Sequence, residues 1–137
     1  FDYSLKKQLI NDKKCYIVDN GFIGALSKKL TKDKGWLLEN LVFNSLNKNN
    51  DVFYYSNENE CDFLLVKNKN ATNAIQVCYD LNDDNREREI SGLKEAMDRF
   101  KLNEGLLLTN SQEDEIKIKG KTIKILPVWK WLLSKIR

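Results

Sequence analysis

The chain has 137 residues, of which 31% are charged and 42% hydrophobic, and a net charge of +3. These values are typical of an ordered globular domain, and the small positive charge permits contact with nucleic acid without requiring it. The absence of histidine excludes Ser-His and Cys-His catalytic centres and histidine metal ligands. No apolar run has the length of a membrane span, and three cysteines without Cys-x-x-Cys spacing favour a cytoplasmic protein over a disulfide framework.

The first 34 residues carry the weakest patterns. Residues 15–18 are a candidate strand, and the residues at 19–21 are typical of a turn. A Lys-rich stretch at 28–34 is expected to be an exposed loop or helix end, with contact to phosphate as the alternative. Nothing in this segment predicts a functional site.

A helical pattern runs from Gly35 to about residue 48, with an apolar arc that contains Trp36 and Phe43. Glu39 lies inside this arc, whereas the asparagines of the helix fall largely opposite. One interpretation is an acid at the helix boundary that reaches water or pairs with a lysine. The other is an acid directed inward to meet a metal or another polar group, because a buried unpaired carboxylate costs several kcal/mol.

Three strands of an antiparallel meander are expected next, at 52–55, 60–66 and 74–79. In the second strand Asp62 leads directly into an apolar run, so its carboxylate needs a partner or a bound cation. In the third strand Gln76 and Cys78 share one face, and the apolar residues between them share the other. Two buried strands that keep polar residues on their faces indicate a site.

The second half of the chain predicts a crossover helix, a buried strand, a hairpin and a final helix. Asp84 and Glu87 have capping-box spacing at the start of the helix, and the strand at 105–109 is expected to run parallel to the strand before the helix. The hairpin at 115–126 turns around Gly120, and Pro127 marks the start of the last helix. Basic residues of the helix and hairpin form either solvated faces or contacts to a phosphate backbone: Arg86, Arg88, Lys117, Lys119 and Lys124.

The order of these elements resembles the core of the PD-(D/E)XK nuclease superfamily. This resemblance covers residues 35–110 and implies an α/β fold with a mixed central β-sheet flanked by helices. Its restriction-endonuclease-like core has the order α-β-β-β-α-β, here followed by a C-terminal hairpin and helix. More narrowly, motifs along almost the whole chain resemble the uncharacterised C-terminal domain of archaeal and bacterial AAA-type ATPases: YIVDNGF at 16–22, GWLLEN at 35–40, ECDF at 60–63, QVCYDL at 76–81 and RERE at 86–89.

The resemblance implies an acid on the first core helix, an acid on the second strand and an acid-x-Lys motif on the third. By position, Glu39 and Asp62 would be the metal-binding acids for Mg²⁺. Gln76 replaces the third acid and Cys78 replaces the lysine, which removes the cation, because a thiol is mostly neutral at pH 7. Such a loss typically costs about 10²- to 10⁴-fold in rate. Lys94 of the crossover helix is a candidate for a migrated lysine.

Three functional hypotheses remain open. The first is a nuclease-fold accessory domain of an AAA-type ATPase that binds DNA and has a degenerate metal site. The second is an active Mg²⁺-dependent DNA endonuclease, and the third is a protein-interaction domain. In each case residues 1–34 would lead in from an ATPase and winged-helix part outside this chain, the only part to bind ATP. Residues 35–137 would form the nuclease-like domain.

Overall fold

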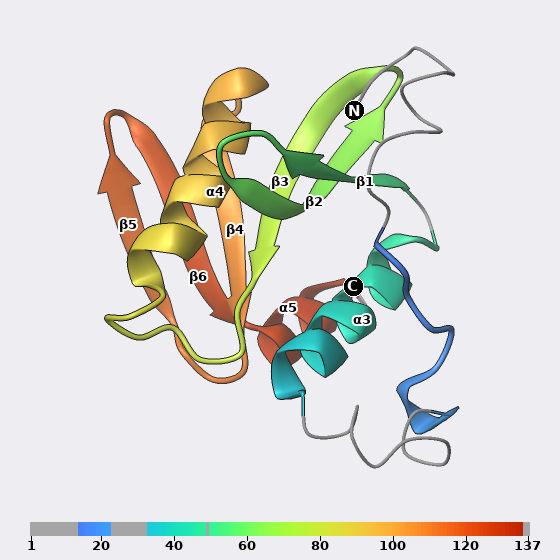
Figure 1. The fold of residues 1–137 in the computed structure, drawn as a ribbon. Helices are drawn as coiled ribbons and strands as arrows, with labels where there is room; N and C mark the ends of the chain where they lie inside the picture. Colours follow the sequence, from blue (N-terminus) through green and yellow to red (C-terminus); the bar gives the residue numbers. More distant parts are fainter. Residues whose placement is uncertain (1–13, 23–32, 49, 136–137) are drawn as a thin grey trace.

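The computed structural model describes residues 14–22, 33–48 and 50–135. A six-stranded sheet lies at the centre of this part of the chain (Figure 1). Its labelled elements follow in chain order: α3 (Lys34–Leu46), β1 (Asp51–Ser56), β2 (Glu60–Lys67), β3 (Asn70–Val77), α4 (Arg86–Arg99), β4 (Glu104–Thr109), β5 (Asp114–Ile118), β6 (Lys121–Pro127) and α5 (Val128–Ser134).

The strand order is β1-β2-β3-β4-β6-β5. The first three strands form the antiparallel meander, and β4 pairs in parallel with β3 after the α4 crossover. β6 pairs in parallel with β4 on the other side, so that β5 becomes an edge strand. The prediction of an α/β fold with a mixed sheet and flanking helices is therefore confirmed. The candidate strand at 15–18 is wrong, because these residues have no strand conformation.

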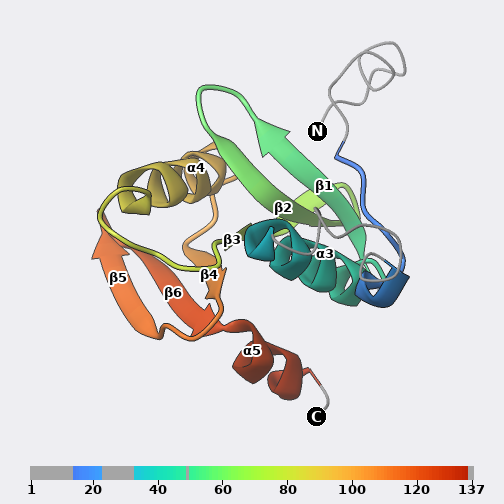
Figure 2. The same ribbon diagram turned by 60° about the horizontal axis from the view of Figure 1, so that its bottom comes forward.

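The helices bury the two faces of the sheet (Figure 2). On one face, α4 packs Leu93 and Met97 against a core that includes Leu64 and Leu107. On the other face, α3 and α5 pack over a second core whose fully or nearly fully buried members include Val42, Leu46, Phe63, Leu108 and Val128. In the described part of the chain, no helix is long and apolar enough to cross a bilayer.

The start of α4 differs from its prediction. The N-cap is Asn85, and its side chain makes no capping bond to the helix, so the capping box of Asp84 and Glu87 is wrong. Instead, the Asn82 side chain accepts hydrogen bonds from the backbone N–H groups of Asp84 and Asn85, at 3.0 and 3.3 Å. A turn stabilised by an asparagine side chain competes with the capping box and delays the helix.

A β-bulge interrupts the pairing of β1 and β2. Phe53 lies opposite Leu64, but Tyr55 lies opposite Cys61, so β2 contains one additional residue in this interval. Bulges redirect side chains and often occur beside functional sites. Here Cys61 and Leu64 both enter the core under α4, although strict alternation would place them on opposite faces. The extra residue therefore allows Asp62 to face α3.

Gly92 allows α4 to lie directly on the backbone of β2. A Cβ atom at this position would stand 1.9 Å from the carbonyl oxygen of Glu60. We expect Gly92→Ala to force α4 away from the sheet and to lower the free energy of unfolding by about 2–3 kcal/mol. Urea unfolding followed by circular dichroism measures this loss.

Gly35→Ala is the matched control for that measurement. A Cβ atom at Gly35, in the first turn of α3, would make an ordinary contact of 3.5 Å with Asp33. Because alanine is the better helix former, we expect this variant to be neutral or more stable by up to about 1 kcal/mol. Equal losses in the two variants would contradict the close approach at Gly92.

Candidate functional site

The site forms where β2 and β3 separate beyond the pair Phe63–Ile75, the last backbone pair at this end of the ladder. Side chains replace the next ladder bonds. The backbone N–H of Asp62 donates to Oε1 of Gln76 at 3.1 Å, and the backbone N–H of Val77 donates to Oδ2 of Asp62 at 2.9 Å. Because buried backbone N–H groups need acceptors, these two side chains have a structural task in addition to any chemical one.

The second oxygen of Asp62 meets a lysine from the segment before α3. Lys14 Nζ lies 2.6 Å from Oδ1 of Asp62 and 3.2 Å from Oε1 of Glu39. The hydroxyl of Tyr16 donates to the same oxygen of Glu39 at 2.7 Å. Glu39 and Asp62 therefore come together, and a single ammonium group lies between them.

Residues 14–20, here called the strap, lie along α3. Asn40 is fully buried and binds the backbone of Ile17 from both sides, because its oxygen accepts from Ile17 N at 2.8 Å and its nitrogen donates to Ile17 O at 2.9 Å. Asn44 donates to Ile17 O as well, at 2.8 Å, and the ring of Tyr16 stacks on Phe43 with centroids 4.0 Å apart. The strap is therefore bound to the side of α3 that presents Asn40 and Asn44.

The other half of the site lies toward α4. The amide nitrogen of Gln76 donates to Oε2 of Glu89 at 2.6 Å, and the guanidinium of Arg88 contacts Oε1 of Glu89 at 2.6 Å. Glu89 is buried although it belongs to a charged helix. Its burial is tolerated because both of its oxygens accept hydrogen bonds, one of them from a cation.

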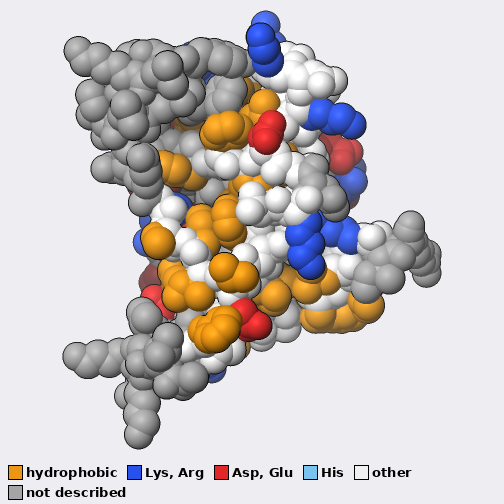
Figure 3. Space-filling model, turned by 90° about the vertical axis from the view of Figure 1, so that its right-hand side faces the viewer, with side chains coloured by type: hydrophobic (Ala, Val, Ile, Leu, Met, Phe, Trp, Pro, Cys, Tyr) orange, Lys and Arg blue, Asp and Glu red, His pale blue; other side chains and the backbone are white. Residues whose placement is uncertain are grey.

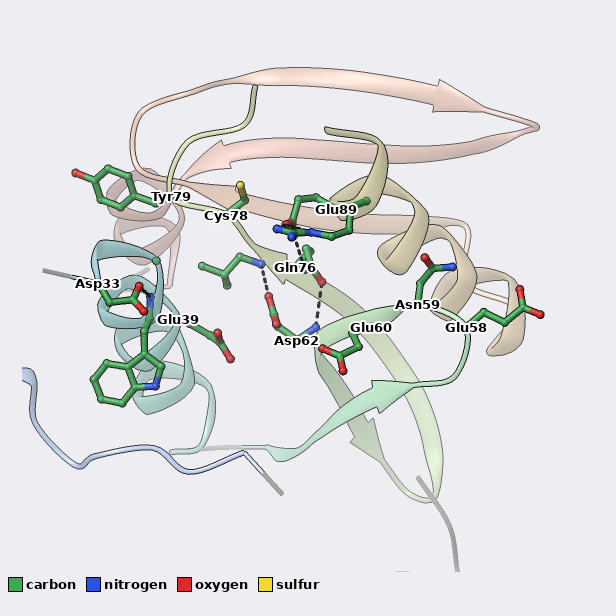
Figure 4. Close-up of a pocket in the computed structure, with 14 residues that line it drawn as sticks. Asp33, Glu39, Glu58, Asn59, Glu60, Asp62, Gln76, Cys78, Tyr79 and Glu89 are labelled. Atoms are coloured by element: carbon green, nitrogen blue, oxygen red, sulfur yellow. Dashed lines mark hydrogen bonds and ion pairs between the residues drawn. The ribbon is translucent and has the colours of Figure 1, made fainter. Parts of the chain in front are cut away.

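Glu39, Asp62, Gln76 and Glu89 line a pocket of about 740 Å³ (Figure 4). Among the described residues that form its wall, six have carboxylates and one, Arg88, has a guanidinium. The pocket rim at the β1–β2 turn is held to α4 by Glu95, which accepts hydrogen bonds from Tyr55, Asn57 and Asn59. The lining residues are Asp33, Gly35, Trp36, Glu39, Glu58, Asn59, Glu60, Asp62, Gln76, Val77, Cys78, Tyr79, Arg88 and Glu89.

Burial and neighbouring charges change the pKa values of the central groups. Burial and, to a smaller extent, the charge of Glu39 raise the pKa of Asp62, and Lys14 and the backbone N–H of Val77 oppose them, so that the pKa is about 6. Burial alone would lower the pKa of Lys14, but Asp62 and Glu39 outweigh it and raise that pKa above its usual value. Burial and Glu89 raise the pKa of the Cys78 thiol to about 11, so this thiol is neutral at pH 7.

The predicted site residues divide into two groups. Glu39, Asp62, Gln76 and Cys78 line one pocket, as their positions suggested. Lys94 does not: it pairs with Asp98 on its own helix at 2.8 Å and is not part of the pocket lining.

The expectation that residues 1–34 contain no site is wrong, because the strap supplies the cation. Sequence reasoning also missed Glu89, although its helical spacing from Leu93 and Ala96 is the same signal that distinguished Glu39. The Lys-rich stretch lies outside the described residues up to position 32, and Lys34 lies over the ring of Tyr79, 5.4 Å from its centroid.

The predicted nucleic-acid-binding residues do not lie in the pocket, apart from Arg88. Four of the five pair with acids: Arg86 with Asp114, Arg88 with Glu89, Lys117 with Glu115 and Lys124 with Glu104. Lys119 lies in the β5–β6 turn, where its φ of 48° and the φ of 80° of Gly120 close the hairpin. The pairs of Arg86, Lys117 and Lys124 are exposed and weak, so they leave these three cations available to a phosphate backbone, whereas Arg88 is bound to the buried Glu89.

The site as arranged does not fit Mg²⁺. This ion prefers six oxygen ligands in octahedral geometry, but both oxygens of Asp62 and the oxygen of Gln76 already accept hydrogen bonds, and Lys14 lies between the two acids. Among residues 14–22, 33–48 and 50–135, no group of three His, Cys, Asp or Glu side chains is arranged to hold a metal ion. The ammonium of Lys14 takes the position in which a cation would neutralise Glu39 and Asp62.

We expect the carboxyl carbon of Asp62 to titrate with a midpoint near pH 6 in ¹³C NMR spectra. Glu95, whose hydrogen bonds lower its pKa to about 2, should titrate at a much lower pH in the same spectra. Because Lys14 favours the ionised form of Asp62, Lys14→Met should raise this midpoint further. A midpoint that Lys14→Met leaves unchanged or lowers would contradict the ion pair.

The direction of the stability change follows from the same values. The pKa of Asp62 is about 6 in the folded chain against 3.8 ordinarily, so the folded state binds the proton more tightly. The contribution of Asp62 to the free energy of unfolding therefore increases as the pH falls from about 7 toward 4, and decreases as the pH rises through 6.

One family model and one curated relative match this chain. The model of the family described as "Domain of unknown function (DUF4143)" matches residues 34–131. The uncharacterized protein MJ1544 of Methanocaldococcus jannaschii is 37% identical over 146 aligned positions, which cover 97% of this chain and 32% of that protein. The chain thus spans about a third of the length of this relative. No solved structure matches. The chain belongs to the DUF4143 family.

Proposed function

We propose that this chain is a nuclease-fold accessory domain of an AAA-type ATPase, that it binds DNA, and that its degenerate acidic site does not cut DNA. One observation carries the proposal. Lys14 lies on both acids where a nuclease would need a metal ion, at 2.6 Å from Asp62 and 3.2 Å from Glu39. A nuclease of this kind needs the metal to activate water and to stabilise the pentacoordinate phosphate.

The accessory role is supported by the length of the relative. The matched region is 32% of MJ1544, which leaves room there for the P-loop ATPase and winged-helix parts that the sequence resemblance implies. The free thiols of Cys15, Cys61 and Cys78 agree with a reducing compartment, and we place the domain in the cytoplasm.

The distribution of charge favours DNA contact outside the pocket. The described residues that line the pocket include six carboxylates and one cation, Arg88, and so disfavour phosphate. A phosphate backbone is therefore expected to contact cations outside this wall. The proposed contact surface comprises the start of α4 and the β5–β6 hairpin, with Arg86, Lys117, Lys119 and Lys124 outside the pocket and Arg88, which also lines the pocket.

Each alternative is supported by a specific observation. The convergence of Glu39, Asp62 and Lys14 favours an active Mg²⁺-dependent endonuclease, because two acids and a lysine are the groups that such a site uses. Exposed hydrophobic residues favour a protein-interaction domain: Val18, Phe22, Leu41, Trp129 and Leu133. Figure 3 shows the face on which hydrophobic side chains are spread among polar ones.

We expect the protein to bind duplex DNA with an affinity that falls steeply between about 50 and about 200 mM salt. Lys117→Ala and Lys124→Ala should each reduce the slope of log K against log salt by about 1, because each removes one phosphate contact. Fluorescence anisotropy with labelled duplex measures both quantities. Lys94→Ala, which removes a cation from outside the proposed surface, is the control and should leave the slope unchanged.

The same preparation tests for cleavage. Supercoiled plasmid, linear duplex, single strand and a four-way junction, incubated with Mg²⁺ or Mn²⁺, should remain intact with the wild type and with Asp62→Ala. Cleavage by the wild type that Asp62→Ala abolishes would establish the endonuclease instead. Absence of both cleavage and salt-dependent binding would favour the protein-interaction domain.

A further inference from the structure

Lys14 belongs to a segment outside the sheet, but its positive charge offsets the negative charges of Glu39 and Asp62 in the site. The side chain of Asp62 is 9% exposed and that of Glu39 is 19% exposed, and both carboxylates contact the same ammonium group, so they share one cation with little water around them. Two such acids repel each other unless a proton or a cation lies between them. In this structure the cation is an ammonium group with three donors, which fits carboxylate oxygens from two directions.

From this geometry we infer that Lys14 is a built-in counter-ion, and that the strap and a divalent cation exclude each other at Glu39 and Asp62. Magnesium and manganese sites commonly use only one or two protein carboxylates and keep several waters, so these two acids can form such a site once the ammonium has left. With the ammonium in place, a divalent cation would bring three positive charges together at two carboxylates.

The ammonium can leave without unfolding the domain. Lys14 is 28% exposed and belongs to no helix or strand. The strap has other attachments: Asn40 and Asn44 hold the backbone of Ile17, and Tyr16 stacks on Phe43. The two acids are fixed separately, because Glu39 belongs to α3 and Asp62 is bonded to the backbone of Val77. Removal of the ammonium therefore leaves two positioned carboxylates without a counter-charge.

The test measures cation binding and needs neither DNA nor catalysis, so its outcome is separate from that of the proposed function. Isothermal titration calorimetry with Mn²⁺ compares the wild type with Lys14→Met, a variant of similar length without the charge. We expect Lys14→Met to bind one Mn²⁺ about tenfold tighter than the wild type, or tighter still, because the uncompensated acids gain a partner.

Two controls locate the effect. Tyr16→Phe removes a hydrogen bond to Glu39 but keeps the ammonium, and it should bind Mn²⁺ no better than the wild type. Adding Asp62→Asn to Lys14→Met should abolish the gained affinity. The inference is overturned if folded Lys14→Met, checked by near-ultraviolet circular dichroism, binds no better than the wild type. It is also overturned if Tyr16→Phe gains as much, or if the double variant still binds.

A measurement on the wild type covers the case in which Lys14→Met does not fold. Mass spectrometry follows how fast an amine-reactive reagent labels Lys14, with the largely exposed Lys117 as internal reference. Competition predicts that Mn²⁺ speeds the labelling of Lys14 relative to Lys117. An unchanged relative rate at the highest soluble Mn²⁺ concentration overturns the inference.

Discussion

The buried carboxylate of Asp62 is the constraint on which the rest of the site depends. A charged group in the interior is costly unless its oxygens are satisfied. Both are: one accepts from the backbone of Val77 and the other from the ammonium of Lys14. Three features of the fold give this carboxylate its partners. They are the bulge in β2, the separation of β2 from β3 and the position of the strap.

The partners of Asp62 extend into a continuous polar chain across the sheet. Lys14 contacts Asp62 on the α3 side, the backbone of Asp62 contacts Gln76, and Gln76 contacts Glu89, which Arg88 neutralises on the α4 side. Gln76 suits the middle of this chain better than an acid would. Its amide accepts from a backbone N–H with one atom and donates to a carboxylate with the other, whereas an ionised glutamate could only accept.

Local patterns predicted most of the helices and strands, although the strand at 15–18 and the capping box of α4 were wrong. The periodicity of α4, the apolar run of β4 and the glycine turn between β5 and β6 each specify their own element, and the crossover rule then makes β3 and β4 parallel. Positions within those patterns also identified Glu39 and Asp62. The remaining parts of the site depend on contacts that no local pattern contains: Lys14 lies 48 residues from Asp62 in the sequence, and Asn40 binds a backbone rather than a side chain.

The location of the cations distinguishes this site from one in which the lysine belongs to the third strand. Position 78 follows the last residue of β3, and its backbone N–H donates to the carbonyl oxygen of Leu108 in β4 at 2.9 Å, so a lysine there would be held at the end of the sheet. Here the sheet supplies acids, Glu60 and Asp62, and neutral groups, whereas Lys14 comes from the strap and Arg88 from α4. The charge of the acid pair therefore depends on the position of a segment that precedes α3 in the chain. We propose that the domain serves an ATPase part that precedes it. In that case the charge of the acid pair depends on the segment of this chain that lies nearest to the ATPase part.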